Sequence, residues 1–320
     1  MESHTLVPLE TAPSPDALAV ELQPHMLLCG HRGLEIYVTT AAESPTVMRE
    51  IGRIRELEYR RVGAGRNVAA DIDGYDTDDN GYAQLIAWDP EAREVVAMYR
   101  FIFGANALRH GGINRLRTAT LFTFAPEFVD RILPHAVELG RSVVNGEANR
   151  AIVGLFAVWA GLGAFVAEFP DLKFFFGNVS VYRSWPTKAV DTLLAFLTAY
   201  YQDDKQLIVA RPTVAYRAET ISRYRETLFA SVGATAGFER LLGELKRYDL
   251  APPPILVSYL KATDRFTVFD TARDDDFGGA WETAISVSTT HLTQRTRRRV
   301  VESYKPVHRD ALRRFYTEKL

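Results

Sequence analysis

The chain has very little cysteine, with Cys29 alone among its 320 residues. One cysteine forms neither an internal disulfide nor a multi-cysteine metal site, which excludes a disulfide-stapled secreted protein. The expected location is therefore the reducing cytoplasm. An excess of basic charge is missing too, because 38 Lys and Arg residues face 40 Asp and Glu residues, a formal net charge of −2. Nucleic acid is accordingly not expected as a partner.

Signatures of bound cofactors are also missing. The sequence contains no GxxxxGK[ST] or GxGxxG phosphate loop, no HExxH and no CxxC, and its seven histidines are scattered. Neither a metal nor a tightly bound nucleotide is expected. Ser142 and Ser180 have no GxSxG setting, which disfavours a serine esterase of the α/β-hydrolase type.

Long hydrophobic runs are limited to residues 151–166, which are short of the roughly 20 residues that span a bilayer. This stretch is interpreted as a buried core helix. Residues 1–24 contain no Lys or Arg and no continuous apolar stretch, so they do not have the pattern of a signal peptide. Any membrane contact is expected to be peripheral, on the inner membrane.

The remaining sequence alternates strand and helix patterns. Alternating or β-rich runs predict strands near 33–39, 83–88, 95–103, 173–182, 206–210 and 283–288, and apolar spacings of three to four predict helices near 48–61, 147–168, 189–201, 218–230 and 237–248. Interleaved strands and helices predict an α/β or α+β fold, with a mixed central sheet flanked by helices. We expect a loosely held arm over 1–30, one domain over 31–290 and a basic tail over 291–320.

Basic charge concentrates in that tail, where nine Lys or Arg residues face three Asp or Glu residues. The tail carries Arg295, Arg297, Arg298 and Arg299. It is interpreted either as a solvated basic helix or as a docking surface for an acidic partner or anionic lipid headgroups, to which each basic residue contributes on the order of 1 kcal/mol.

Charged residues also occur within apolar segments. Asp71, Asp73 and Asp76 form a D-x-D-x-x-D cluster before a predicted strand, Arg100 lies inside a strand pattern, and Glu138-Leu139-Gly140-Arg141 stands between two apolar pairs. Because removing an ion from water costs several kcal/mol, these groups are expected to pair with one another. On these residues alone, a buried network that only stabilises the sheet is an open alternative to a reactive site.

In order along the chain, the acidic cluster, the aromatic-Arg pair Tyr99-Arg100 and the E-L-G-R motif resemble the acyl-homoserine-lactone synthase branch of the GNAT-like N-acyltransferases. The sequence is still more similar to the ornithine-lipid and N-acyl-amino-acid synthases often labelled hemolysin-like. Further blocks of this resemblance lie at 47–56, 84–89, 176–180 and 254–259. It implies a GNAT-like fold and transfer of a long-chain, in some members 3-hydroxylated, fatty acyl group from acyl carrier protein to the α-amine of an amino acid such as ornithine or glycine.

The resemblance assigns roles to the charged residues. Glu138 is expected to act as the base, and backbone N–H groups of a splayed strand around 99–103 to hold the oxyanion. Arg100 and Arg141 suit the acceptor's carboxylate, because a guanidinium binds a carboxylate bidentately, although each could instead neutralise a neighbouring acid. Asp71, Asp73 and Asp76 either recognise a basic group of the acceptor or orient Arg100. Ser142 is included in the substrate site.

Aromatic residues provide candidate walls for the acyl chain. They include Phe101, Phe103, Trp159 and Phe176, with Ser180 beside them, and further phenylalanines at 156, 165, 174 and 175. Plain core packing is the alternative for this set. Arg295, Arg297, Arg298 and Arg299 are expected to dock the acidic carrier protein.

Two other functions stay open at this point. Acyl-CoA could replace the carrier protein as donor. The sequence lacks the Q/R-x-x-G-x-G/A loop whose amides bind the CoA phosphates, and this absence argues against CoA. A lipid-binding or membrane-associated protein without turnover is the second. The sequence decides neither the acceptor, the chain length nor the oligomeric state.

Overall fold

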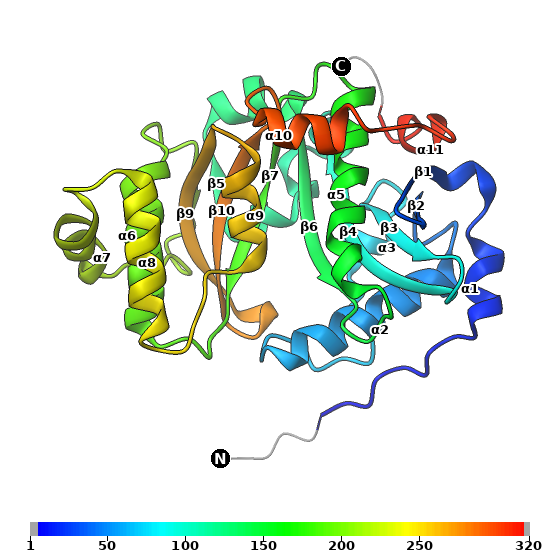
Figure 1. The fold of residues 1–320 in the computed structure, drawn as a ribbon, viewed down its shortest axis with the longest axis horizontal. Helices are drawn as coiled ribbons and strands as arrows, with labels where there is room; N and C mark the ends of the chain where they lie inside the picture. Colours follow the sequence, from blue (N-terminus) through cyan, green and yellow to red (C-terminus); the bar gives the residue numbers. More distant parts are fainter. Residues whose placement is uncertain (1–5, 317–320) are drawn as a thin grey trace.

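An eight-stranded sheet organises the chain, and helices cover both of its faces (Figure 1). The structure is a computed structural model that describes residues 6–316. The strands of this sheet are β1 (Leu27–His31), β2 (Leu34–Thr39), β3 (Ala83–Asp89), β4 (Glu94–Phe103), β6 (Ala136–Val144), β7 (Phe174–Val181), β9 (Phe266–Asp274) and β10 (Ala280–Ser288), while β5 (Phe122–Phe124) pairs with β8 (Ile208–Ala210) separately. The expected fold class is therefore confirmed: the sheet is mixed and helices flank it.

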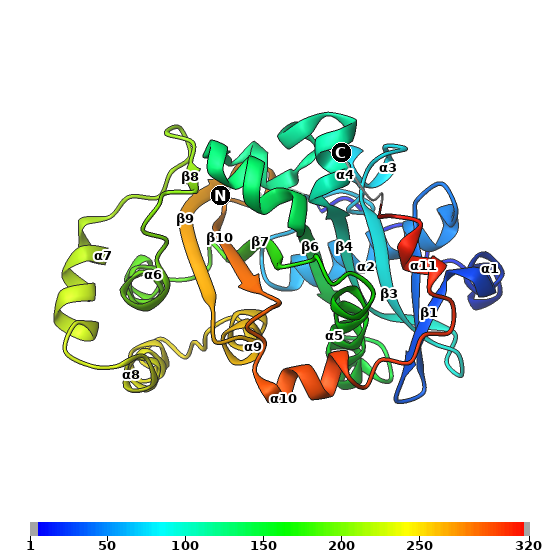
Figure 2. The same cartoon turned by 90° about the horizontal axis from the view of Figure 1, so that it is seen from above.

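The helices divide between the two faces of the sheet (Figure 2). They are α1 (Pro15–Glu21), α2 (Pro45–Arg61), α3 (Gly74–Thr77), α4 (Gly104–His110), α5 (Ala151–Glu168), α6 (Thr187–Tyr201), α7 (Glu219–Tyr224), α8 (Ala234–Lys246), α9 (Pro254–Ala262), α10 (Gln294–Thr296) and α11 (Asp310–Arg313). Short 3-10 or π turns include η3 (Arg117–Thr120), η6 (Arg225–Phe229) and η8 (Arg297–Val301). Helices α5, α9 and α10 lie on one face and α2, α3 and α4 on the other, with α6 to α8 beyond β9.

The strand order is β1-β2-β3-β4-β6-β7-β10-β9. Every neighbouring pair is antiparallel except β6 and β7, which run parallel. Their pairing extends from Ala136 opposite Phe174 to Leu139 opposite Gly177. Past these residues β7 continues along β10 while β6 continues along β4, so the sheet splits in its middle.

Helix α5 is apolar along its whole length, with a mean hydropathy of 1.9, and by length and composition it could cross a membrane. In this fold 61% of it is buried, against the sheet on one side and η8 on another. A Cβ atom on Gly163 would fall 1.9 Å from the carbonyl oxygen of Val300, so only glycine lets η8 approach this closely. The interpretation as a core helix agrees with this packing.

Two segments differ from expectation. The described part of the 1–30 arm is ordered against the domain, because β1 joins the sheet and Leu18 and Met26 are buried. The tail is not one helix but a series of short turns, and its backbone bonds back to β1 through Val307 and His308. A few buried apolar residues, widely spaced in the sequence, hold both segments against the domain. Because these residues do not form a periodic pattern, the sequence did not reveal them. Residues 1–5 and 317–320 lie outside the described residues.

Candidate active site

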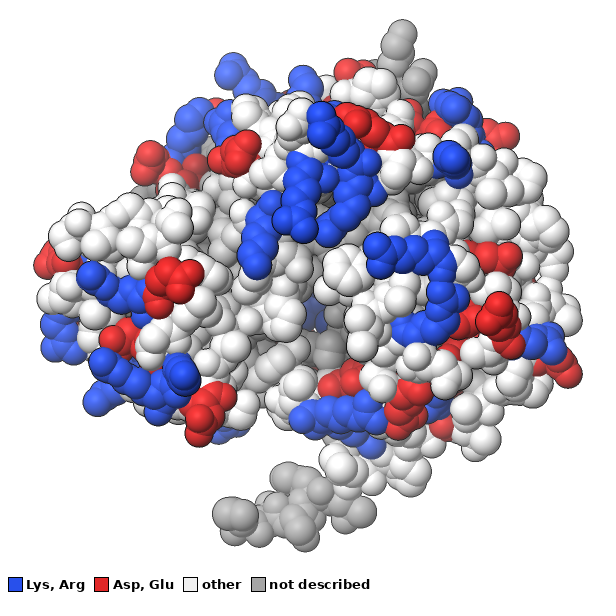
Figure 3. All heavy atoms as spheres, viewed as in Figure 1, with Lys and Arg blue, Asp and Glu red and all other residues white. Residues whose placement is uncertain are grey.

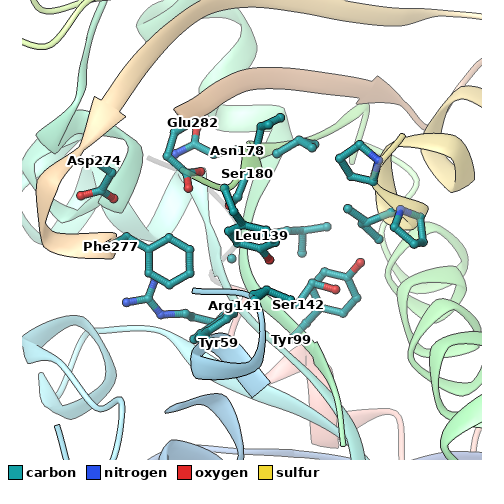
Figure 4. Close-up of a pocket in the computed structure, with 18 of the residues that line it drawn as sticks. Tyr59, Tyr99, Leu139, Arg141, Ser142, Asn178, Ser180, Asp274, Phe277 and Glu282 are labelled. Carbon is teal, nitrogen blue, oxygen red and sulfur yellow. The ribbon is translucent and has the colours of Figure 1, made fainter. Parts of the chain in front are cut away.

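A cavity of about 520 Å³ occupies the split between β6 and β7 (Figure 4). The split has a backbone cause. Gly177, at φ +156°, lies so close to β6 that a Cβ atom there would fall 2.2 Å from the carbonyl oxygen of Leu139. Just beyond, the register of β6 against β4 shifts between Gly140 and Val143, and Arg141 adopts a left-handed φ of +49°. Such strain in a non-glycine residue is typical of functional sites.

The cavity is lined from both faces of the sheet, because side chains of neighbouring strand residues point to opposite faces. From the face covered by α2 come charged and polar groups, among them Arg100, Glu138, Arg141, Asn178, Ser180 and Glu282. From the face covered by α5 and α9 come mainly apolar groups, among them Leu155, Val179, Val181, Leu250, Ile255 and Tyr259. The cavity therefore passes through the sheet from a polar end to an apolar end.

Buried ion pairs support the polar end. Arg100, 1% exposed, donates to Asp73 at 2.8 Å and to Asp76 at 3.1 Å. Arg55, also buried, donates to Asp76 at 3.2 Å and to Gln84 at 2.6 Å. Burial by itself would raise the pKa of Asp76, but the guanidiniums of Arg55 and Arg100 hold it well below its usual range.

Arg141 is held by a second set of contacts. Its Nε lies 2.7 Å from Oδ2 of Asp71, and its guanidinium lies 5.0 Å from the ring centroid of Phe277. Burial would raise the pKa of Asp71, yet Arg141, Arg55 and Arg100 lower it. The aspartates thus pair with arginines and do not line the cavity, whereas Arg100 and Arg141 do line it. This geometry fits the alternative in which the acidic cluster orients Arg100, and Asp71 holds Arg141 in the same way.

Glu138 points into a network of neutral donors. Its Oε2 accepts from the Tyr82 hydroxyl at 2.7 Å, and its Oε1 accepts from the backbone N–H of Thr118 at 2.8 Å and from the hydroxyl of the same residue at 2.6 Å. Tyr82 in turn accepts from the backbone N–H of Arg117 at 2.8 Å. Burial raises the pKa of Glu138, and these hydrogen bonds oppose the shift.

Glu282 is a second cavity carboxylate, and sequence reasoning missed it. It lies on β10 directly opposite Ser180 of β7, is 5% exposed, and its carboxylate points toward the cavity (Figure 4). Burial raises its pKa to about 7, against the opposing effect of a hydrogen bond with Ser180. The predicted strand at 283–288 began three residues too late and so left Glu282 just outside it. The available signal was a single charged residue in a β-rich run. The same kind of signal singled out Arg100.

Most of the residues expected to form acyl-chain walls do not line the main cavity. Phe101 and Phe103 pack beneath α5, where Phe101 meets Phe165 edge to face with 4.7 Å between ring centroids. Phe176 packs on the opposite face against Phe128 and lines a small second cavity, and Trp159 lines a separate surface groove. Among these candidates only Ser180 lines the main cavity, together with Ser142 of the substrate set. Aromatic composition alone does not distinguish a cavity wall from core.

The strand with the open edge is β6, not β4 as expected. Residues 99–103 lie between β3 and β6, with Arg100 opposite both Gln84 and Gly140, and Phe101 opposite both Ala83 and Leu139. Their backbone N–H groups are therefore used within the sheet. The edge that faces the split is residues 140–142 of β6.

The arginines of the tail gather on the face that carries α5 and α9, above a hollow between these helices (Figure 3). Arg295, Arg298 and Arg299 are exposed, and Arg295 and Arg299 line a groove with Phe156 and Lys261. Arg297 differs, because it is half-buried and donates to the carbonyl of Thr289. Leu155 lines both this groove and the cavity, so the two adjoin.

Comparison with known proteins identifies the class. Residues 54–159 match the acetyltransferase (GNAT) domain family. A glycine N(alpha)-acyltransferase of Bacteroides thetaiotaomicron is 35% identical over 286 residues, 87% of this chain and 84% of that protein. One of Phocaeicola vulgatus is 36% identical over 286 residues, 87% of each chain. A GNAT domain on a split mixed sheet defines an N-acyltransferase, as the sequence predicts. More narrowly, the chain belongs to the glycine N(alpha)-acyltransferase family.

Solved structures of acyl-homoserine lactone synthases resemble the chain more distantly. The CoA-dependent synthase BjaI, in a structure with SAM and isopentyl-CoA, is 12% identical, with a TM-score of 0.36 over 88% of this chain and 99% of that one. The AHL synthase LasI is 14% identical, with a TM-score of 0.33 over 46% of this chain and 72% of that one.

Proposed function

We propose that this enzyme transfers a long fatty acyl chain from acyl carrier protein to the α-amine of glycine, giving an N-acylglycine. The observation that carries the proposal is the cavity through the split sheet, which offers cations and carboxylates at one end and an apolar wall at the other. An amino acid suits the first end and an alkyl chain the second. The thioester carbon then lies at the split, between the two.

The acceptor end supports a small zwitterion. The guanidinium of Arg141 reaches the cavity and suits the acceptor's carboxylate, and the buried carboxylates Glu138 and Glu282 suit its ammonium. The aspartates that would attract a basic side chain are already paired with Arg55, Arg100 and Arg141. This pairing and the names of the two relatives favour glycine over ornithine.

The donor end supports a carrier protein over free CoA. In many acyltransferases CoA phosphates bind free N–H groups at a helix start. Before α5 these groups already have acceptors within the chain: the N–H of Gly146 donates to Glu58 at 2.9 Å and that of Asn149 to Glu94 at 2.8 Å. Two carboxylates at this position repel a pyrophosphate. The exposed Arg295, Arg298 and Arg299 offer a separate docking surface for an acidic carrier.

The reaction needs a held oxyanion as well as a neutral amine. We assign the oxyanion to backbone N–H groups of residues 140–142 on the open edge of β6, because donors fixed in a strand need no reorganisation during the reaction. The amine attacks the thioester carbon, the C–S bond breaks, and the carrier leaves as its thiol. We expect neither a metal nor another cofactor to take part.

The location follows from the substrates. Acyl carrier proteins and free amino acids are cytoplasmic, so the enzyme is proposed to act there. Phe156 and Ile152 are exposed on α5, on the same face as the arginines, and this pairing suits peripheral contact with anionic lipid of the inner membrane.

The test compares donors and acceptors directly. The purified protein is incubated with glycine or ornithine and with the same acyl chain on carrier protein or on CoA, and products are identified by mass spectrometry. We expect N-acylglycine, formed faster from the carrier protein. Faster turnover of acyl-CoA would overturn the assigned donor, and acylornithine as the main product would overturn the assigned acceptor.

Charge reversal tests the docking surface. Changing Arg295, Arg298 and Arg299 to Glu should raise KM for acyl carrier protein about tenfold or more, and make it less dependent on salt, because exposed charges steer association. The rate with acyl-pantetheine should not change. The matched control reverses Arg223 of α7, Lys246 of α8 and Arg247 directly after it, at the far end of the molecule, and should behave as wild type. Equal effects of both triple variants would contradict a specific docking surface.

A further inference from the structure

We infer that Glu282, and not Glu138, accepts the proton that the acceptor's ammonium must lose before it attacks. This inference rests on the proposed function and names the base within the same cavity. Both carboxylates are buried and both line the cavity. They differ in what surrounds their oxygen atoms.

Glu138 is committed to accepting hydrogen bonds. A backbone N–H can only donate, so the Thr118 N–H at 2.8 Å requires an unprotonated Oε1. The Tyr82 oxygen already accepts from the N–H of Arg117, so its own proton goes to Oε2 of Glu138. Protonating Glu138 would weaken these bonds, because a carboxylate is a stronger hydrogen-bond acceptor than a neutral carboxyl group. Its evident role is to tie η3 to β6.

Glu282 accepts fewer hydrogen bonds than Glu138, and the cations near it are already paired with other carboxylates. Its hydrogen-bond partner is the hydroxyl of Ser180. The charged groups that face it are Asp274 on β9, Arg117 on η3 and Arg141 on β6, and the titratable Tyr182 follows directly after β7. Arg117 is paired with Asp274, and Arg141 with Asp71. With both cations committed, an incoming ammonium would supply the counter-charge that Glu282 lacks.

The proton affinity of Glu282 suits this role. Its pKa is raised to about 7, first by burial and next by the charge of Asp274, with Ser180 opposing. A base with a pKa near the working pH is unprotonated often enough to act and basic enough to accept.

The protons balance in two steps. The Glu282 carboxylate takes one proton from the ammonium, and the neutral nitrogen forms a bond to the thioester carbon. As the C–S bond breaks, the nitrogen loses its second proton to the departing sulfur. The products are the amide, the carrier thiol and a proton on Glu282, which solvent removes before the next turnover.

The experiment measures kcat and kcat/KM for glycine between pH 6 and pH 9. In the wild type, kcat/KM should fall below about pH 7. Glu282→Gln should lower kcat about 100-fold or more, the usual contribution of a general base, and abolish that acid limb. Its circular dichroism and melting should resemble those of the wild type. Glu138→Gln should keep the limb.

Two neighbouring variants make the test independent of how Glu282→Gln folds. Ser180→Ala removes the hydrogen bond that lowers the pKa of Glu282, so the limb should move to higher pH. Asp274→Asn removes a charge that raises it, so the limb should move to lower pH. A residue with only a structural role would not give opposite shifts.

Three outcomes would overturn the inference. Glu282→Gln could retain kcat within about threefold, the limb could stay in place in both neighbouring variants, or the limb could vanish in Glu138→Gln alone. A wild-type enzyme that acylates no amino acid would instead overturn the proposed function itself, before any variant is compared.

Discussion

The two ends of the cavity are built in different ways. At the polar end, three buried or nearly buried arginines (55, 100 and 141) face three aspartates (71, 73 and 76), and ion pairs link α2, the 71–76 segment, β4 and β6. At the apolar end, α9 and the segment before it meet the sheet through apolar and aromatic contacts, with a 3.3 Å contact between the hydroxyls of Tyr99 and Tyr259. Directional bonds thus hold the polar end, whereas mainly apolar packing forms the other end.

The largest expected effect is at the polar end. Arg100→Met removes the buried cation shared by Asp73 and Asp76 and leaves Asp76 with Arg55 as its cation, so the free energy of unfolding should fall by about 3–5 kcal/mol in urea titrations. The matched control is Arg61→Met, which removes a partly exposed arginine paired with Glu58 and Glu147 and should cost about 1 kcal/mol or less. Equal losses in the two variants would remove the contrast between buried and surface pairs.

The second-largest expected effect is on how the free energy of unfolding depends on pH. The pKa of Glu282 is about 7 in the fold against 4.5 when unperturbed, so its contribution to stability is present below about pH 4.5 and is lost as pH rises through 7. The loss is on the order of 3 kcal/mol. Asp71 and Asp76 have lowered pKa values and act oppositely, losing stability as the pH falls below their usual range.

Urea titrations at pH 5 and pH 8 measure this effect. Between the two values, Glu282→Gln should lose less stability than the wild type, since a neutral amide does not titrate. Parallel changes in the two proteins would mean that Glu282 titrates alike in the folded and unfolded chains.

A smaller effect is expected where the polar end meets the acceptor. Arg141→Gln should raise KM for glycine by about 10- to 100-fold, corresponding to the 1.5–3 kcal/mol of a charged hydrogen bond. Glycinamide, which has no carboxylate, serves as the control acceptor, and its KM should not change. If both acceptors suffer alike, Arg141 does not bind the carboxylate.

The smallest effect concerns the apolar end. Tyr259, Leu139 and Asn178 line both the main cavity and a small second cavity beside it. Tyr259→Ala should join the two and shift the preferred acyl chain to longer lengths, measured by competition among carrier proteins with different chains. Tyr259→Phe, which keeps the ring, should retain the wild-type preference. An unchanged optimum in Tyr259→Ala would mean that the chain ends elsewhere.

Two neighbouring strands and most of the charged site could be predicted from the sequence. The predicted strands 83–88 and 95–103 agree with β3 and β4 within one residue, since alternation and the Asp89-Pro90 turn are local signals. Arg100, Glu138 and Arg141 were singled out because charge in an apolar strand needs a partner. All three line the cavity.

The errors arose where the structure depends on pairing between strands far apart in the sequence, or on which face of the sheet a side chain occupies. Strand β9 was not predicted, and β10, which carries Glu282, reaches its place by pairing with β7, about a hundred residues away in the chain. The acyl walls were chosen by residue type. Strand alternation already separates Arg100 from Phe101, because adjacent strand residues point to opposite faces, so both could not line one side of a site.

A cavity that passes through a sheet also dictates how its product leaves. An acylglycine would have its headgroup on the α2 side and its chain on the α5 side, so that it passes through the gap between β6 and β7. In that pose it would leave along its own length. If the carrier covers the apolar mouth, release must be ordered, with the empty carrier leaving first and the lipid following tail first toward the face where a membrane would receive it.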